Sequence, residues 1–176
     1  MDVGAFVDGV AAARIGRTFN QYASGERAEL LRTRLAVYLE AHEEAALLLV
    51  GEAPGYRGAR VSGVPFTSER QLTGAGPAEA TATLVHRTLD ELGLAGRVLF
   101  WNVVPTHPGT AVGNRRPTRN EVECGLPFAR RLARGRPILA VGRIAEHALG
   151  APYLRHPSHG GAAAFASALD AATRRL

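Results

Sequence analysis

The sequence contains a single cysteine, Cys124, and no apolar run long enough to cross a membrane. One cysteine excludes an internal disulfide bond and a metal site built from four cysteines. The longest apolar run is Ala45–Val50, whereas a membrane-spanning helix needs about 20 residues. The first residues, MDVGAFVDGVAAARIGRTF, also lack the basic start and continuous apolar core of a secretion signal. These absences predict a cytoplasmic protein with no membrane partner.

Lysine is missing altogether, so all 21 basic side chains are arginine, and the net charge is +5. A basic protein attracts polyanions, and arginine binds phosphate in a bidentate manner that lysine cannot match. A chain rich in arginine and alanine and free of lysine is also what a GC-rich genome encodes. Coding bias is the better explanation of the missing lysines, so the net charge alone argues only weakly for DNA.

The rest of the composition is that of a folded globular chain. Of its 176 residues, 46% are hydrophobic and 21% are charged, which sets it apart from disordered sequences. This length fits one compact domain, residues 1–176, and leaves little room for two.

Apolar side chains spaced by three or four predict a series of helices. A capping-box pattern, TRNE from Thr118, starts one of them, and Pro127 must either kink or restart that helix. Pro77 can open another. The predicted helices cover residues 26–43, 77–92, the stretch from 118 onward, 143–150 and 160–176.

Three short apolar runs between these helices predict strands buried on both faces, over residues 46–50, 97–104 and 137–142. Strands that alternate with helices indicate an α/β protein with helices on both faces of a sheet. We therefore expect a single-domain three-layer α/β/α sandwich around a central, mostly parallel four-stranded sheet. In such sheets, ligands bind beyond the carboxyl ends of the strands.

Three unusual segments lie where this architecture binds ligands: the loop GEAPGYRGARVSGVPF after the first strand, NVVPTHP after the second, and HPSHGG near the end. The first has glycines but neither nucleotide fingerprint, and no serine lies in a G-x-S-x-G elbow. A metal site could be drawn from His107, His156 and His159, yet the sequence has no H-E-x-x-H motif. We expect neither a metal nor another cofactor.

Taken in order, VGEAPG, G-x-PF, NVVP, NRRPT…E…C, VG…A…LG and HPS resemble the uracil-DNA glycosylase superfamily, over residues 46–161. The resemblance is strongest to the thermophile-type branch that carries an iron–sulfur cluster. It implies a monomeric, monofunctional glycosylase of base excision repair, which flips uracil or a related deaminated base out of DNA and hydrolyses its N-glycosidic bond.

The resemblance also assigns roles to individual residues. Gly51–Gly55 matches the loop that places a water beside the sugar, Phe66 the aromatic that stacks on uracil, Asn102 the amide that reads O4 and N3, and His156 the donor to O2. The implied catalytic residues are Glu52, Asn102 and His156. The implied uracil-binding residues are Gly51, Ala53, Pro54, Gly55, Phe66, Asn102 and His156. The implied DNA-binding residues are Arg57, Arg60, Arg115, Arg116, Pro157, Ser158, His159 and Gly160.

Each assignment has a purely structural alternative when it is taken alone. Asn102 could satisfy a turn, Phe66 could belong to the core, His156 could bond to loop backbone, and Glu52 could cap a helix. Arg57 and Arg60 fit a solvated loop as well as they fit contacts with DNA phosphates. The order of the motifs is what favours the functional interpretation.

Two departures from the family pattern bear on function. Ala53 and Gly55 stand where many uracil enzymes carry the aspartate that activates water and the tyrosine that excludes the methyl group of thymine. Thr106 stands where the iron–sulfur branch has a cysteine, and one cysteine cannot hold a cluster that needs about four. We therefore expect a cluster-free relative whose NVVPTHPG segment is ordered differently. The alternatives are a catalytically silent member that binds damaged DNA or a free nucleobase, and a metal-dependent nucleotide hydrolase.

Overall fold

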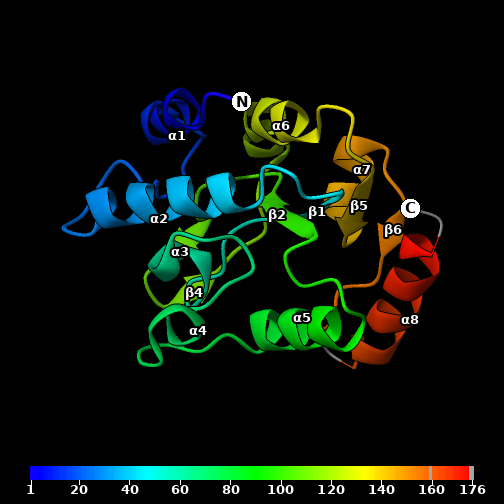
Figure 1. Ribbon diagram of the computed structural model, residues 1–176. Coiled ribbons are helices and arrows are strands. Elements are labelled where there is room, and N and C mark those ends of the chain that lie inside the picture. The colour runs from blue at the N-terminus through cyan, green and yellow to red at the C-terminus, as the bar shows by residue number, and fades with distance from the viewer. Residues whose placement is uncertain (159, 175–176) are drawn as a thin grey trace.

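The computed structural model describes residues 1–158 and 160–174, and four parallel strands lie at its centre (Figure 1). The strands are β1 (Leu47–Gly51), β2 (Val98–Asn102), β5 (Ile138–Val141) and β6 (Tyr153–Leu154). Their order across the sheet is β2-β1-β5-β6, and each neighbouring pair is parallel. The predicted four-stranded parallel sheet is confirmed, and the two-residue strand β6 is the member that had no pattern in the sequence.

Helices cover both faces of this sheet, because successive strand residues point to opposite sides. Leu48 and Val50 of β1 pack into one apolar cluster, and Leu47 and Leu49 pack into the other. The first cluster is completed by α1 (Val3–Ala12), α2 (Ala28–Ala41), α6 (Arg119–Ala133) and α7 (Arg143–Leu149). The second is completed by α5 (Ala80–Glu91) and α8 (Ala162–Thr173). Figure 1 shows α5 and α8 together on the side of the sheet away from α1 and α6, which confirms the three-layer sandwich.

The capping box predicted at Thr118 begins α6. The Thr118 hydroxyl accepts the backbone N–H of Glu121 at 3.3 Å, and the Glu121 carboxylate accepts the N–H of Thr118 at 2.8 Å. The helix then continues through Pro127 to Ala133 without a restart.

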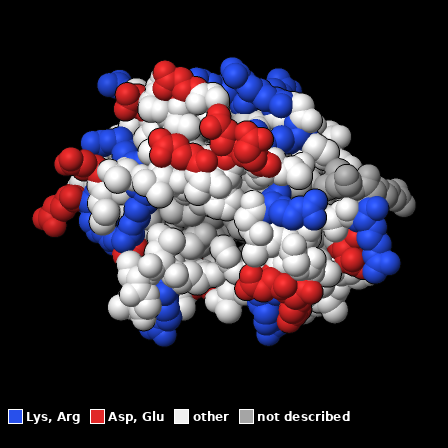
Figure 2. All heavy atoms as spheres, in the orientation of Figure 1, with Lys and Arg blue, Asp and Glu red and all other residues white. Residues whose placement is uncertain are grey.

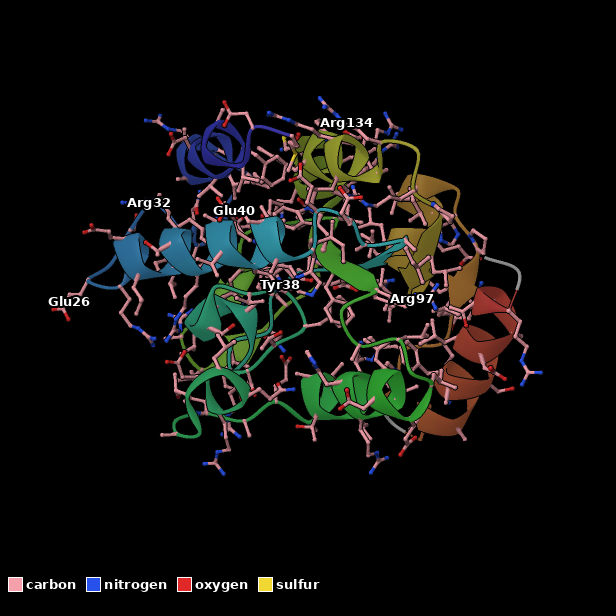
Figure 3. The ribbon with its side chains drawn as sticks, viewed as in Figure 1. Glu26, Arg32, Tyr38, Glu40, Arg97 and Arg134 are labelled. Atoms are coloured by element: carbon pink, nitrogen blue, oxygen red, sulfur yellow. The ribbon has the colours of Figure 1, made fainter. Side chains whose placement is uncertain are left out.

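The outer edge of β2 is covered by α2. The backbone N–H of Phe100 donates to the hydroxyl of Tyr38 at 2.6 Å, which satisfies an edge group that no neighbouring strand reaches. Figure 3 labels Tyr38 on the side of α2 that faces the sheet, with Glu40 on the opposite side of the helix.

The loops beyond the strand ends contain short elements that the sequence did not predict. They are the helices α3 (Ala59–Ser62) and α4 (Glu69–Thr73) and the antiparallel hairpin of β3 (Gly109–Thr110) and β4 (Gly113–Asn114). Within the described part of the chain, no helix combines the length and the apolar character needed to span a bilayer.

Candidate functional site

A small cavity of about 70 Å³ lies at the carboxyl ends of β1 and β2. It brings together all eight residues predicted for catalysis or uracil binding: Gly51, Glu52, Ala53, Pro54, Gly55, Phe66, Asn102 and His156. Four further residues complete its wall: Ala59, Glu79, Thr81 and Ala82. Three loops that are distant in the sequence therefore meet at the edge of the sheet where α/β folds bind ligands.

The first loop is held against the second by an extension of the sheet. Gly51 pairs with Asn102 at the ends of β1 and β2, and Val103 and Val104 then donate to the carbonyls of Gly51 and Glu52 at 2.9 and 3.0 Å. A Cβ at Gly51 would lie 2.9 Å from Cε2 of Phe66 and 3.0 Å from Oδ1 of Asn102. The absence of a side chain at Gly51 therefore lets the Phe66 ring and the Asn102 amide both pack against this position.

Phe66 has a strained backbone that a neighbouring histidine supports. Among the described residues it is the one non-glycine residue with a positive φ, 53°, a conformation that costs about 1–3 kcal/mol. Nε2 of His86, from α5, lies 3.1 Å from the Phe66 carbonyl oxygen and donates to it. Burial lowers the pKa of His86. The Phe66 ring lies 5.3 Å from the ring of Phe100, at an interplanar angle of 30°.

The far end of the first loop is fixed by the segment after β2. Nδ1 of the buried His107 lies 2.8 Å from the carbonyl oxygen of Pro54, and its Nε2 lies 2.9 Å from that of Thr110. The N–H of Tyr56 donates to the side chain of Asn114, in β4, at 2.9 Å. The ring nitrogens of His107 thus face backbone carbonyls rather than a metal position.

Glu52 is the carboxylate of the GEAPG motif, and it is partly buried at the cavity. Burial raises its pKa, and the nearby positive charge of Arg116 opposes that rise. A carboxylate with a raised pKa is a stronger base than one in water.

His156 is oriented by the residues that follow it. Its Nδ1 accepts the backbone N–H of Ser158 at 3.2 Å and lies 2.7 Å from the Ser158 hydroxyl. Because Nδ1 is an acceptor, a neutral ring carries its proton on Nε2. Pro157 is buried and Gly160 is exposed, and the predicted DNA contact His159 lies outside the described residues.

The four predicted DNA-binding arginines are in different environments. Arg57 and Arg116 are exposed, and Arg60 is half-buried. The guanidinium of Arg57 lies over the ring of Tyr56 at 5.3 Å, and that of Arg60 lies over the ring of Phe19 at 5.0 Å. The guanidinium of Arg115 donates to both carboxylate oxygens of Glu121, at 2.6 and 2.7 Å. Arg57 and Arg116 are thus the arginines best placed to meet DNA phosphates.

A hydrogen-bond network surrounds the NVVPTHPG segment, which was expected to be ordered without a cluster. The hydroxyl of Thr106 lies 2.6 Å from that of Thr18, and the N–H of Arg17 donates to Glu121 at 3.0 Å. Cys124 is exposed on α6. The NVVPTHPG segment is therefore tied to the amino-terminal region by polar side chains.

A wider groove, of about 590 Å³, lies along the outer side of β2, between α2, α4 and α5. The surface between α2 and α5 is largely uncharged in Figure 2. The groove includes His86 and Phe100 but none of the loop residues that line the smaller cavity. Its polar side chains include Tyr38, which bonds to the backbone of β2, and Arg34, which pairs with Glu69.

The sequence motifs did not reveal Glu79, whose side chain enters the cavity from the start of α5. It lies in TGAGPAEAT, a stretch that looks like an ordinary connection before a helix. No sequence pattern relates Glu79 to Gly55, so the place of Glu79 in the cavity could be found only from the folded structure.

Comparison with known proteins agrees with this fold. Residues 39–171 match a family model described as the uracil DNA glycosylase superfamily. The structure is similar to the crystal structure of wild-type SMUG2 from Pedobacter heparinus, with a TM-score of 0.68 and 12% sequence identity over 99% of this chain and 97% of that chain. A search of curated proteins finds no match. Since the family model spans most of the sequence, this chain belongs to the uracil DNA glycosylase superfamily.

Proposed function

We propose that this protein is a DNA glycosylase that extrudes uracil, or a related deaminated base, and hydrolyses its N-glycosidic bond as the first step of base excision repair. The observation that supports this proposal is the convergence of Phe66, Asn102 and His156 on one small cavity. An enzyme cannot reach a glycosidic bond inside a stacked duplex, so the base must enter such a pocket.

In this proposal the base stacks on Phe66 while its polar edge meets Asn102. Base–aromatic stacking contributes about 1–3 kcal/mol. The side chain of Asn102, which is 5% exposed, offers both a donor and an acceptor and so pairs with O4 and N3–H of uracil. Cytosine presents the reversed pattern at that edge and would leave buried polar groups unpaired.

His156 stabilises the departing base. When the bond between C1′ and N1 breaks, the electron pair stays on the base, and negative charge develops at O2. A proton on Nε2 of a neutral His156, favoured by the bond from Ser158 to Nδ1, can donate to that oxygen. Removing one such donor typically costs on the order of 10²–10³ in rate.

Glu52 is the candidate base for the attacking water. The water oxygen bonds to C1′ of the cationic sugar, and its proton passes to the Glu52 carboxylate. The raised pKa of Glu52 favours this role, and the positive charge of Arg116 limits that rise. Glu52 thus takes the place of the aspartate that Ala53 replaces.

DNA would bind across the mouth of the cavity. Arg57 and Arg116 are exposed and fit phosphate contacts, and the half-buried Ser158 and the exposed Gly160 fit contacts with the DNA beside the extruded base. Within the family, the GEAPG motif and the single cysteine favour a cluster-free relative of the iron–sulfur branch. The monomeric state and the cytoplasmic location stay predictions from the sequence.

The direct test is incubation with a labelled oligonucleotide that carries one uracil, followed by alkali. We expect strand cleavage at the uracil alone. Asn102→Ala and His156→Ala should each reduce the rate at least about tenfold, or 1.4 kcal/mol in activation free energy. Glu91→Ala, at the exposed far end of α5, is the control that should leave the rate unchanged.

The second candidate function is that of a silent family member, which Ala53 favours because it removes the usual water-activating aspartate. A gel shift with uracil-containing DNA in the absence of any cleavage would support it. Normal turnover in both Asn102→Ala and His156→Ala would contradict the proposed site.

A further inference from the structure

Glu79 is an acidic side chain in the cavity with no part in the chemistry described above. It is the N-cap residue of α5, yet its side chain makes no capping hydrogen bond. The carboxylate instead turns into the cavity, where it lines the same wall as Gly55 and Ala59. Among the described residues, no hydrogen bond or ion pair to this carboxylate accounts for its burial.

The carboxylate fills space that two glycines leave. A Cβ added at Gly58 would lie 2.7 Å from the Glu79 carboxyl carbon, and one at Gly55 would lie 3.1 Å from it and collide with Oε1. Neither glycine has the positive φ that usually explains a glycine in a loop. Gly55 and Gly58 therefore leave room for the Glu79 carboxyl group, which takes the place of a side chain in this wall.

The position of this wall follows from the order of atoms around a pyrimidine ring. The proposed contacts place O2 at His156, and N3 and O4 at Asn102. The next ring position after O4 is C5, and the lining left for it includes Gly55, Ala59, Thr81, Ala82 and Glu79, of which Glu79 has the longest side chain. Burial raises the pKa of Glu79, and no cation opposes that rise as Arg116 does at Glu52.

We propose that Glu79 limits the extruded base to pyrimidines without a substituent at C5, so that uracil enters and thymine does not. This inference rests on the proposed function, because the base orientation comes from it. A methyl group at C5 would meet the carboxyl group, which occupies the space beside Gly55 and Gly58. One methyl group in a fitted pocket changes binding by roughly 10–200-fold.

The test measures binding rather than cleavage. Matched duplexes carry a 2′-fluoro-2′-deoxyuridine or its 5-methyl counterpart, because the fluorine slows loss of the base. We compare the wild type with Glu79→Ala, with the isosteric Glu79→Gln, and with Glu91→Ala as a control on the same helix. The wild type, Glu79→Gln and Glu91→Ala should prefer the uracil duplex by at least about tenfold. Glu79→Ala should bring that ratio close to one by binding the 5-methyl duplex more tightly.

Three results would overturn the inference: a wild type without preference, an unchanged preference in Glu79→Ala, or a loss of uracil binding in both Glu79 variants. The last would mean that Glu79 holds uracil rather than excluding a methyl group. Melting temperatures check that each variant is folded. Uracil cleavage by the wild type is scored separately, so a protein that discriminates without cleaving would contradict the proposed chemistry and leave the role of Glu79 intact.

Discussion

Glu121 joins three parts of the chain, and its replacement by glutamine has a calculable cost. Its carboxylate accepts N–H groups from Arg17 at 3.0 Å and Thr118 at 2.8 Å, together with the paired bonds from Arg115. The Arg115 guanidinium is the main reason that the pKa of Glu121 falls from 4.5 to about 2. At about 1.4 kcal/mol for each pH unit, this difference corresponds to about 3 kcal/mol of stability.

The sign of the pH dependence follows from that lowered pKa. The stabilisation is present above pH 4.5 and is lost as the pH falls towards 2, because the folded state must then be protonated. Glu121→Gln cannot offer acceptors on both sides, so we expect it to lower the free energy of unfolding by about 3 kcal/mol at pH 7. The difference in the free energy of unfolding between the wild type and Glu121→Gln should therefore decrease as the pH falls below 4.5.

Urea unfolding at a series of pH values measures this difference. Glu69 also has a lowered pKa, because Arg34 and Arg27 pair with its carboxylate. Glu69 is present in both proteins, so its contribution cancels when the free energies of unfolding of the wild type and the variant are subtracted. Glu123→Gln is the matched control, since Glu123 is on the same helix and its pair with Arg119 is exposed. Such surface pairs contribute about 0–1 kcal/mol. A Glu121→Gln variant as stable as this control at pH 7 would refute the reasoning.

Two further predictions concern the cavity. The glycosylase rate of the wild type should decline as the pH falls, with a midpoint above pH 4.5, because burial raises the pKa of Glu52. Glu52→Gln should be slower than the wild type, and its rate should not decline in this way. A decline that persists in Glu52→Gln would show that another group causes it. His86→Ala removes the bond to the strained Phe66 backbone, so uracil-duplex affinity should fall roughly fivefold, or about 1 kcal/mol. The exposed Thr83→Ala on the same helix is its control, and equal affinities for the two variants would show that Phe66 holds its position unaided.

The strands were predictable because each is a short apolar run between polar loops. Residues 46–50, 97–104 and 137–142 contain β1, β2 and β5, with small shifts at the ends. Strand β6 has two residues, one of them exposed, and such a strand carries no periodicity. The start of α6 was found because a capping box is a local pattern, whereas α5 begins at Ala80, three residues after the proline expected to open it.

The cavity was predictable where its residues lie at strand ends and in recognisable motifs. Asn102 and Gly51 meet because parallel strands end at the same edge of the sheet. The place of Glu79 in the cavity and the pairing of Arg115 with Glu121 were not predicted, since these contacts are set by packing. The position of Glu79 depends on α5 reaching the loop at Gly55 and Gly58. The pairing of Arg115 depends on the Glu121 carboxylate, which the capping box places within reach.

The polar network around Glu121 is connected to the cavity through the amino-terminal segment. The amino-terminal segment bonds to the carbonyl of Pro105 through Gln21 and pairs with His107 through Phe19. His107 in turn holds Pro54, at the end of the first loop. Both loops of the site are therefore anchored to the same segment that Glu121 fixes. A loss of this carboxylate should consequently reduce uracil cleavage at temperatures where the protein is still folded.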